Sequence, residues 1–256
     1  MIRSRSMRFG AYEVHVAPLP AVAALLILVL LLSAGFWQLR RAEGKREIAV
    51  EQADRRDRET LVLEPGMAAS ASLARLRHRR ARAAGQYRSD IQYLLDNSIQ
   101  NHAVGYQVLT PFRLQNSDVY LLVNRGWLPL GPDRGRLPDI TVSEQATSPE
   151  GLIVAPPASG LELGASGYDG EGWPRVVQRV ELDRIQEQLG KPLLPFVLRL
   201  SPAADYGYGR NWRIRTGLTP ERHVGYAVQW FALAAALLGL CGWVAVKRAP
   251  EEPHGP

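Results

Sequence analysis

Four residues near the C-terminal end of the chain have types and a spacing that could bind a planar, largely apolar ligand. His223 is followed three, four and seven positions later by Tyr226, Ala227 and Trp230. On an α-helix these positions share a face, so the imidazole would stand above a small residue flanked by aromatic rings. A porphyrin could lie against that face with His223 as an axial ligand of its iron. The alternative is that His223 is a polar residue at a membrane boundary and that Tyr226 and Trp230 belong to the aromatic belt.

The residues before His223 predict the start of a helix. Thr219 can cap the first free amides, Pro220 fits the first helical position, and Glu221 complements the positive end of the helix dipole. The apolar run that follows has one strongly polar side chain, Gln229, which we expect to face protein or a cavity. About 20 helical residues cross a bilayer, so 219–246 is predicted to be a transmembrane helix.

A second apolar run, 18–39, predicts another transmembrane helix. Its alternative is a secretory signal peptide cleaved after Ser33-Ala34-Gly35. Because the run continues through Trp37 into arginines, as at a membrane boundary, a retained helix is favoured. Small residues four apart in the later helix could let this helix approach closely, namely Ala232 with Ala236 and Ala235 with Gly239.

Two spans place both termini on one side of the membrane and the region 40–218 on the other. Basic residues in both tails favour cytoplasmic tails at 1–17 and 247–256, although Arg40, Arg41, Lys45 and Arg46 flank the other side of the first span. Arginines at membrane edges and on a solvated face account for the net charge of +6 better than nucleic acid binding does.

The residues also limit the chemistry that the chain could perform. The sole cysteine, Cys241, lies within the second span, and no cysteine or methionine cluster suits zinc or copper. His78 lies in a basic run that is expected to be solvated, and His102 lies in a loop and is expected to be exposed. No Ser/His/Asp set, paired catalytic carboxylates or phosphate loop is present, so we predict no enzyme and no metal other than haem iron.

The middle region reads as a β-rich α+β domain, an antiparallel barrel or sandwich, behind a helical extension that frays near Arg58. Gln115 to Asp118 predicts a hairpin turn, Pro157 to Pro174 a long loop, and 182–189 a short helix that stops at Gly190. The strand "LLPFVLRL" is expected at a sheet edge because it contains Pro195.

In "LLVNRGWLP", Asn124-Arg125-Gly126-Trp127 ends a strand. This segment is either an ordinary turn or a site where the guanidinium group of Arg125 binds a carboxylate, such as a haem propionate, with Trp127 nearby.

Taken together, these motifs resemble the surfeit-locus (Surf-one) family of cytochrome oxidase assembly factors. The resemblance covers nearly the whole chain: "GFWQLRRAEGK", "LLDN", "GYQVLTPF", "LLVNRGW", "DRIQEQLGKPLLPFVLRL" and "PERHVGYAVQWFALA" occur in order. Where the family often shows Trp-Gln-Asn before its last helix, this chain has Val177-Gln178-Arg179, so any contact made there would differ.

The resemblance implies a membrane protein of the bacterial inner membrane with a periplasmic domain. It also implies a role in building the haem a-containing subunit I of cytochrome c oxidase, with haem a synthase and membrane lipid as partners. The family's proposed haem contact falls on His223, and Tyr226, Trp230 and Trp127 carry over as haem-proximal or structural residues. Arg222 and Arg125 could neutralise the propionates. Two alternatives stay open: a scaffold that holds the nascent subunit without haem, and a domain acting on a quinol oxidase.

Overall fold

The computed structural model describes residues 5–9, 12–69, 72–133, 135–157, 167–204, 206–212 and 218–248. The chain divides into two compact units. One unit contains the two ends of the chain, 1–50 and 215–256, and the other contains 51–214. The predicted loop from Pro157 to Pro174 lies partly outside the described residues.

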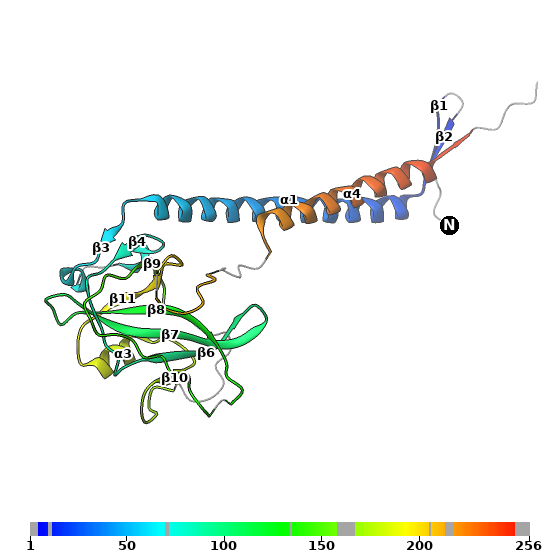
Figure 1. Ribbon diagram of the computed structural model, residues 1–256. Helices are drawn as coiled ribbons and strands as arrows, with labels where there is room; N and C mark the ends of the chain where they lie inside the picture. The colour runs from blue at the N-terminus through cyan, green and yellow to red at the C-terminus, as the bar shows by residue number, and fades with distance from the viewer. Residues whose placement is uncertain are drawn as a thin grey trace, which may run out of the picture. The chain divides into compact units, whose positions relative to one another are not determined.

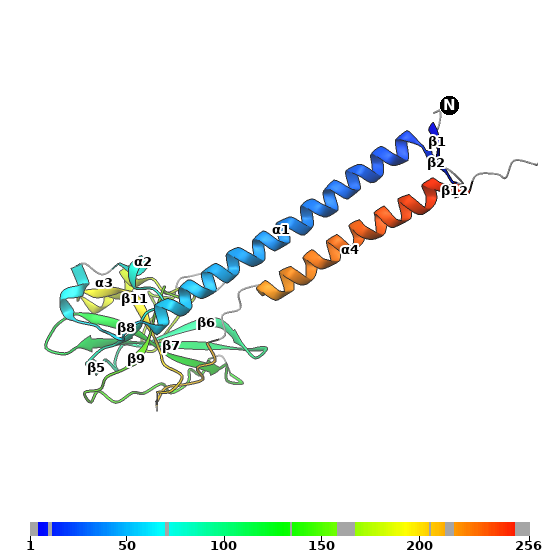
Figure 2. The ribbon, with the colours of Figure 1, turned by 90° about the horizontal axis from the view of Figure 1, so that it is seen from above.

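The first unit is built around two long helices, α1 (Pro18–Asp57) and α4 (Pro220–Ala245). Both are long and apolar enough to cross a membrane. They lie side by side and run in opposite directions (Figures 1 and 2). The two predicted apolar helices are therefore confirmed, and α1 ends at Asp57, next to the Arg58 at which the sequence suggested fraying.

A small sheet joins the two ends of this unit. The strands β1 (Arg5–Phe9), β2 (Tyr12–Val16) and β12 (Val246–Arg248) pair antiparallel, with β2 in the middle. β12 follows α4 directly and pairs Val246 with Val14. These strands lie at the predicted cytoplasmic tails, 1–17 and 247–256, for which the sequence predicts no strand.

The second unit is built on a nine-stranded sheet (Figure 1). Its strands are β3 (Leu61–Val62), β4 (Arg80–Arg82), β5 (Gly85–Tyr87), β6 (Tyr93–Gln100), β7 (Ala103–Leu114), β8 (Tyr120–Pro129), β9 (Glu150–Val154), β10 (Arg175–Val177) and β11 (Leu193–Leu200). The order is β10-β6-β7-β8-β11-β9-β4-β3, with β5 paired to β7.

The predicted antiparallel barrel or sandwich is therefore wrong in two respects. The pairs β10/β6, β11/β8 and β3/β4 are parallel, so the sheet is mixed, and its strand order does not close into a barrel. Parallel neighbours are joined by long connections rather than hairpins. Short strands separated by turn residues therefore cannot reveal them.

Three short helical elements contact this sheet. The helix α3 (Leu182–Leu189) buries Ile185 and Leu189 and stops at Gly190 in the left-handed conformation, as predicted. The other short helices are the 3-10 turn η1 (Pro65–Ala69) and α2 (Leu73–Leu76). Tyr168, from the Gly-rich connection, is 1% exposed, and its hydroxyl donates to Arg179 O and accepts from Glu181 N. This tyrosine fixes the start of α3.

The strand with Pro195 is in the interior of the sheet, which corrects the predicted edge position. β11 pairs with β8 on one side and with β9 on the other. Pro195 lies where the pairing to β8 shifts register, between Leu193 and Val197, and before the pairing to β9 begins at Val197. The missing N–H is therefore tolerated because it falls in a gap of the ladder.

Candidate functional site

The helix that carries His223 begins as the sequence predicted. The Oγ of Thr219 accepts from Arg222 N, Pro220 occupies the first turn, and Glu221 lies there as well. The backbone N–H of His223 donates to Thr219 O at 3.2 Å. This cap fixes the imidazole on the first turn of α4.

The imidazole is directed at the other helix. His223 is 6% exposed, and its Nδ1 lies 2.7 Å from Oε1 of Gln38 on α1. An amide oxygen can only accept a hydrogen bond, so Nδ1 carries the proton and donates. The neutral ring then has its lone pair on Nε2, which is the atom that can coordinate a metal.

The buried residues at the contact between the helices are spaced by four and then by seven residues on both helices. The buried residues are Leu31, Gly35 and Ala42 on α1 and His223, Ala227 and Ala234 on α4. Phe231 of α4 fills the space left by Gly35, where an added Cβ would lie 2.6 Å from its ring. Phe231 also meets Phe36 edge to face, with ring centroids 5.3 Å apart.

The other helix, α1, covers only part of the face that the four predicted residues share. At about 100° per residue Tyr226 lies about 60° from His223, and it is 41% exposed, whereas Ala227 is buried against α1. Trp230 is half-buried at the edge of the contact. His223 and Ala227 thus face α1, Trp230 borders them, and Tyr226 points outward.

The small residues expected at the helix contact lie elsewhere. Ala232, Ala235, Ala236 and Gly239 are exposed, while Ala227 and Ala234 make the approach. Ala232 comes five residues after Ala227, which is about 140° around the helix, so the predicted stripe does not face α1. Sequence alone did not say which stripe α1 covers. Gln229 is also exposed rather than turned toward α1, so a contact with a partner protein stays a prediction.

Cationic side chains surround the first turn of α4. Lys45 of α1 donates to the backbone oxygen of Leu218, and Arg222 is exposed beside the imidazole in sequence. Arg41, one turn before Lys45 on α1, is also exposed. Sequence reasoning missed Gln38 and the role of Lys45. The signal was present, because both lie in the segment "QLRRAEGK" that leaves the apolar run.

The structure places Arg125 in the interior of the sheet domain. It is 5% exposed, and its Nη1 donates to Ile140 O at 2.9 Å and to Gln92 Oε1 at 3.1 Å. Its guanidinium also faces the rings of Tyr87 and Tyr208, at 5.8 and 5.1 Å from their centroids. Burial lowers the pKa of Arg125. A propionate contact stays a prediction, and it would compete with these protein acceptors.

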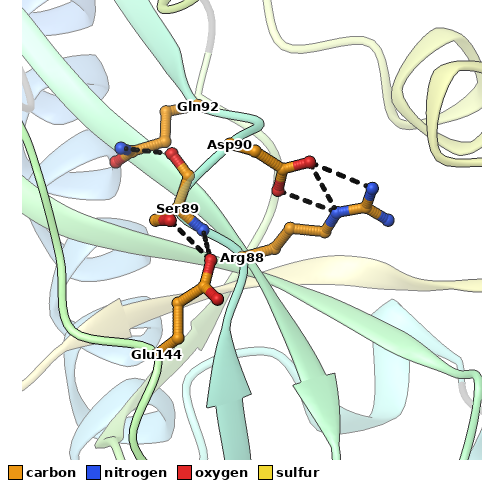
Figure 3. A network of polar contacts seen from close by, with 5 residues as sticks. All are labelled: Arg88, Ser89, Asp90, Gln92 and Glu144. Atoms are coloured by element: carbon orange, nitrogen blue, oxygen red, sulfur yellow. Dashed lines mark hydrogen bonds and ion pairs between the residues drawn. The ribbon is translucent and has the colours of Figure 1, made fainter.

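The acceptor Gln92 is itself held by the loop between β5 and β6 (Figure 3). Its Nε2 donates to Ser89 O at 3.0 Å, and the backbone N–H of Ser89 donates to Glu144 Oε1 at 2.9 Å. The hydroxyl and N–H donors of Ser89 hold the pKa of Glu144 below its usual range. This network sets the position of Gln92 and through it the guanidinium of Arg125.

The neighbours of Arg125 are structural as well. The segment Asn124–Trp127 lies within β8 rather than at its end, opposite a register shift at Val108 and Leu109. Trp127 is half-buried and its Nε1 donates to Ser98 O at 2.9 Å. Gly126 has φ 126°, and a Cβ there would lie 2.8 Å from the carbonyl carbon of Tyr208. Only glycine fits this position without strain.

The two histidines of the sheet domain differ from each other. His102 is exposed in the turn between β6 and β7, as predicted. His78 is half-buried rather than solvated, and its backbone N–H donates to Ile153 O at 2.8 Å. Among the described residues, no group of three histidine, cysteine, aspartate or glutamate side chains is placed to hold a metal ion.

The chain thus combines a pair of apolar helices, which share a partly buried polar contact, with a mixed-sheet domain. The sequence model of the SURF1 family matches residues 25–235. The chain belongs to this family, which is generally linked to cytochrome c oxidase assembly, and the resemblance seen in the sequence is confirmed.

Named relatives agree with this assignment. The SURF1-like protein of Caenorhabditis briggsae is 24% identical, over 94% of this chain and 77% of its own length. That of Caenorhabditis elegans is 24% identical, over 88% and 72%. The SURF1-like protein of Drosophila melanogaster is 30% identical, over 57% of this chain and 46% of its own length.

Proposed function

We propose that this protein assists the assembly of a haem–copper terminal oxidase by binding haem a at His223 and delivering it to subunit I. It performs no covalent chemistry on the haem. The observation that carries the proposal is the hydrogen bond between His223 Nδ1 and Gln38 Oε1.

This hydrogen bond suits an iron ligand for a physical reason. Histidines that bind metals commonly donate the other ring N–H to an oxygen acceptor, which fixes the tautomer and the ring orientation. Gln38 supplies that acceptor to His223 and leaves Nε2 unprotonated. Haem, when bound, would supply the iron that Nε2 of His223 would hold.

The surrounding side chains suit the rest of a haem. Trp230 and the outward-facing Tyr226 offer aromatic surface beside His223 for the apolar part of the macrocycle. Arg222, with Lys45 and Arg41 of α1, offers positive charge for the propionates. Arg125 and Trp127 hold the sheet domain together in this proposal, and a propionate contact of Arg125 is secondary.

The partners in this proposal are haem a synthase as the donor, subunit I as the acceptor, and membrane lipid around α1 and α4. Arginines and lysines near both ends of the chain favour termini in the cytoplasm and the sheet domain in the periplasm of a bacterial inner membrane. The equivalent place in mitochondria is the intermembrane space. The bacterial assignment is part of this proposal, and the named relatives, which are eukaryotic, do not support it.

An absorption spectrum tests the haem proposal. The full chain is purified from cells that make haem a, as the parent protein and as His223→Ala and His102→Ala. We expect a Soret band in the parent and in His102→Ala, whose side chain is exposed in the sheet domain. We expect little or no haem in His223→Ala. Equal haem in all three would overturn the proposal. A parent without haem that still binds subunit I would favour the scaffold.

Reporter fusions test the orientation. Alkaline phosphatase, which is active only outside the cytoplasm, is fused after Asn116 in the turn between β7 and β8, or after Arg248. Activity is expected from the first fusion alone, and the reverse result would contradict the orientation. An N-terminal sequence that begins at Gly35 or Phe36 would instead show a cleaved signal peptide.

A further inference from the structure

Two arginines project from the same face of the large sheet. Leu152 of β9 is paired with Arg80 of β4 on one side and with Arg199 of β11 on the other. Residues directly opposite one another in adjacent strands point to the same side, and strands lie about 4.8 Å apart. Two guanidinium groups therefore rise from one row, separated by an aliphatic side chain.

A cavity lies over this row. Its volume is about 750 Å³, and we call it the arginine cavity, lined by Arg56, Arg80, Glu150, Arg199, Tyr206 and Trp212. The guanidinium of Arg199 lies 5.1 Å from the centroid of the Trp212 ring. The Nε1 of Trp212 donates to Leu200 O at 2.8 Å, which fixes the ring. The cavity thus combines a fixed aromatic surface with arginines from three elements, α1, β4 and β11.

The charge in the arginine cavity is unbalanced. Among the described residues, no carboxylate forms an ion pair with Arg56, Arg80 or Arg199. The Nε of Arg56 is buried without a hydrogen-bond partner. Glu150 is the one carboxylate among the lining residues that the structure describes, so within this described set three cations face one anion. Half-buried charges such as those of Arg56 and Arg199 normally have partners, and the described part of the chain supplies no ion pair to either of them.

The effect of these cations reaches a neighbouring side chain. Burial lowers the pKa of the His78 imidazole, and Arg77, Arg56 and Arg199 lower it further. An anion in the cavity would offset part of this repulsion, because a nearby negative charge favours the imidazolium. His78 can therefore report on the occupancy of the cavity.

We propose that the arginine cavity binds the phosphate group of an organic phosphate monoester. A monoester carries about −1.5 to −2 charges at pH 7 and three acceptor oxygens. These values match the excess of two positive charges and the three guanidinium groups. A carboxylate has one charge and two oxygens and would leave one arginine without an anion. The volume exceeds that of a phosphate alone and lies in the range of about 300–1,000 Å³ typical of small-ligand sites. Trp212 and Leu152 offer apolar surface to the carbon part.

The test follows the pKa of His78 by NMR in the full chain, in phosphate-free maltoside micelles, during titration with glycerol phosphate. We expect the pKa of His78 to rise with occupancy, while the exposed His102 does not respond. Acetate at the same ionic strength should have little effect on either. An equal response to acetate, or a His102 that follows His78, would show general screening and overturn the proposal.

Matched variants distinguish a specific phosphate site from general electrostatic attraction by the basic surface. Arg80→Gln is at an exposed position of β4, so the fold should tolerate it, and it should weaken glycerol phosphate binding by about tenfold, the loss of one charge-assisted hydrogen bond. Arg56→Gln should act similarly. Arg113→Gln, an exposed arginine of β7 outside the cavity, should leave binding unchanged. Arg80→Gln and Arg113→Gln with the same affinity as the parent would refute the assignment.

The natural source of the monoester is distinguished by a second titration. Phosphatidic acid and glycerol phosphate carry the same group, one in the membrane and one in solution. Micelles with phosphatidic acid are compared with micelles of maltoside alone. Competition of phosphatidic acid with glycerol phosphate indicates a lipid headgroup, and binding of glycerol phosphate alone indicates a soluble ligand. Absence of binding by both would overturn the proposal. None of these outcomes depends on haem binding.

Discussion

Shortening Gln38 by one methylene group removes the hydrogen bond to His223 and leaves the rest of the helix pair in place. The donor and acceptor are 2.7 Å apart, and one carbon–carbon bond is about 1.5 Å long. In Gln38→Asn the amide oxygen therefore retreats to about 4 Å from Nδ1, which is too far for a hydrogen bond. The imidazole then loses the acceptor that fixes its tautomer.

The expected result is a weaker haem complex. Loss of a hydrogen bond behind a metal ligand typically reduces affinity about 10- to 100-fold. Gln38→Glu should instead strengthen the bond between the His223 imidazole and the iron. A carboxylate accepts more strongly, makes the imidazole a stronger donor to iron, and lowers the reduction potential of the haem.

The assay is a haem titration of the purified full chain, followed at the Soret band, with a potentiometric titration of the complex. Gln229→Asn is the matched control, because Gln229 lies in α4 but is exposed, away from α1. Unchanged affinity and potential in both Gln38 variants, with haem lost in His223→Ala, would refute the role of Gln38 while the iron ligand stands. Unchanged haem in His223→Ala would refute the ligand itself.

Three other perturbations follow from the packing. Arg125→Leu removes four hydrogen bonds of a charged group. Counting only the two shortest, to Ile140 O and Gln92 Oε1, at about 1.5 kcal/mol each, urea unfolding followed by tryptophan fluorescence should show a loss of about 3 kcal/mol. Gly35→Val should lower the thermal midpoint in detergent through a clash with Phe231, at a cost of about 1–3 kcal/mol, and Phe231→Ala in the same chain should restore part of it. Burial raises the pKa of Tyr168 to about 12, above its unfolded value of about 10. The neutral phenol stabilises the fold below pH 10, so the free energy of unfolding should fall between pH 10 and 12, and less steeply in Tyr168→Phe. The stated causes would be contradicted if Arg125→Leu were as stable as the parent, or if Phe231→Ala did not restore stability to Gly35→Val. The cause given for Tyr168 would be contradicted if the free energy of unfolding fell equally steeply with pH in the parent and in Tyr168→Phe.

Local signals were the part of the fold that the sequence could predict. The cap at Thr219, the stop at Gly190 and the turn at Gln115–Asp118 depend on residues within one or two turns of each other. The structure has all three where they were expected. The apolar runs of α1 and α4 were equally clear, because length and hydropathy decide them.

The errors concern contacts between distant residues. Parallel pairing of β11 with β8 depends on how the chain crosses the sheet, and no local pattern encodes that path. Pro195 was assigned to an edge because a register shift is invisible in one strand alone. An arginine is exposed by default, so the burial of Arg125 could be seen only with Gln92 and Tyr208 in place.

The candidate site also has a local part that the sequence predicted and a distant contact that it did not. The sequence located His223 and its helix, but not the stripe of α4 that α1 covers. Gln38 is 185 positions away from His223 in the chain. The pairing of the two became visible only once both helices were placed antiparallel.

The small sheet of β1, β2 and β12 fixes the axial register of the two helices. Helices slide past one another in steps of about one turn, 5.4 Å. A strand keeps its faces only when it slips by two residues, about 6.8 Å. Because β12 continues α4 and β2 precedes α1, neither step can be taken without breaking the other register. Because the helix step and the strand step differ in length, the small sheet keeps Gln38 opposite His223 although it lies at the far end of the helix pair.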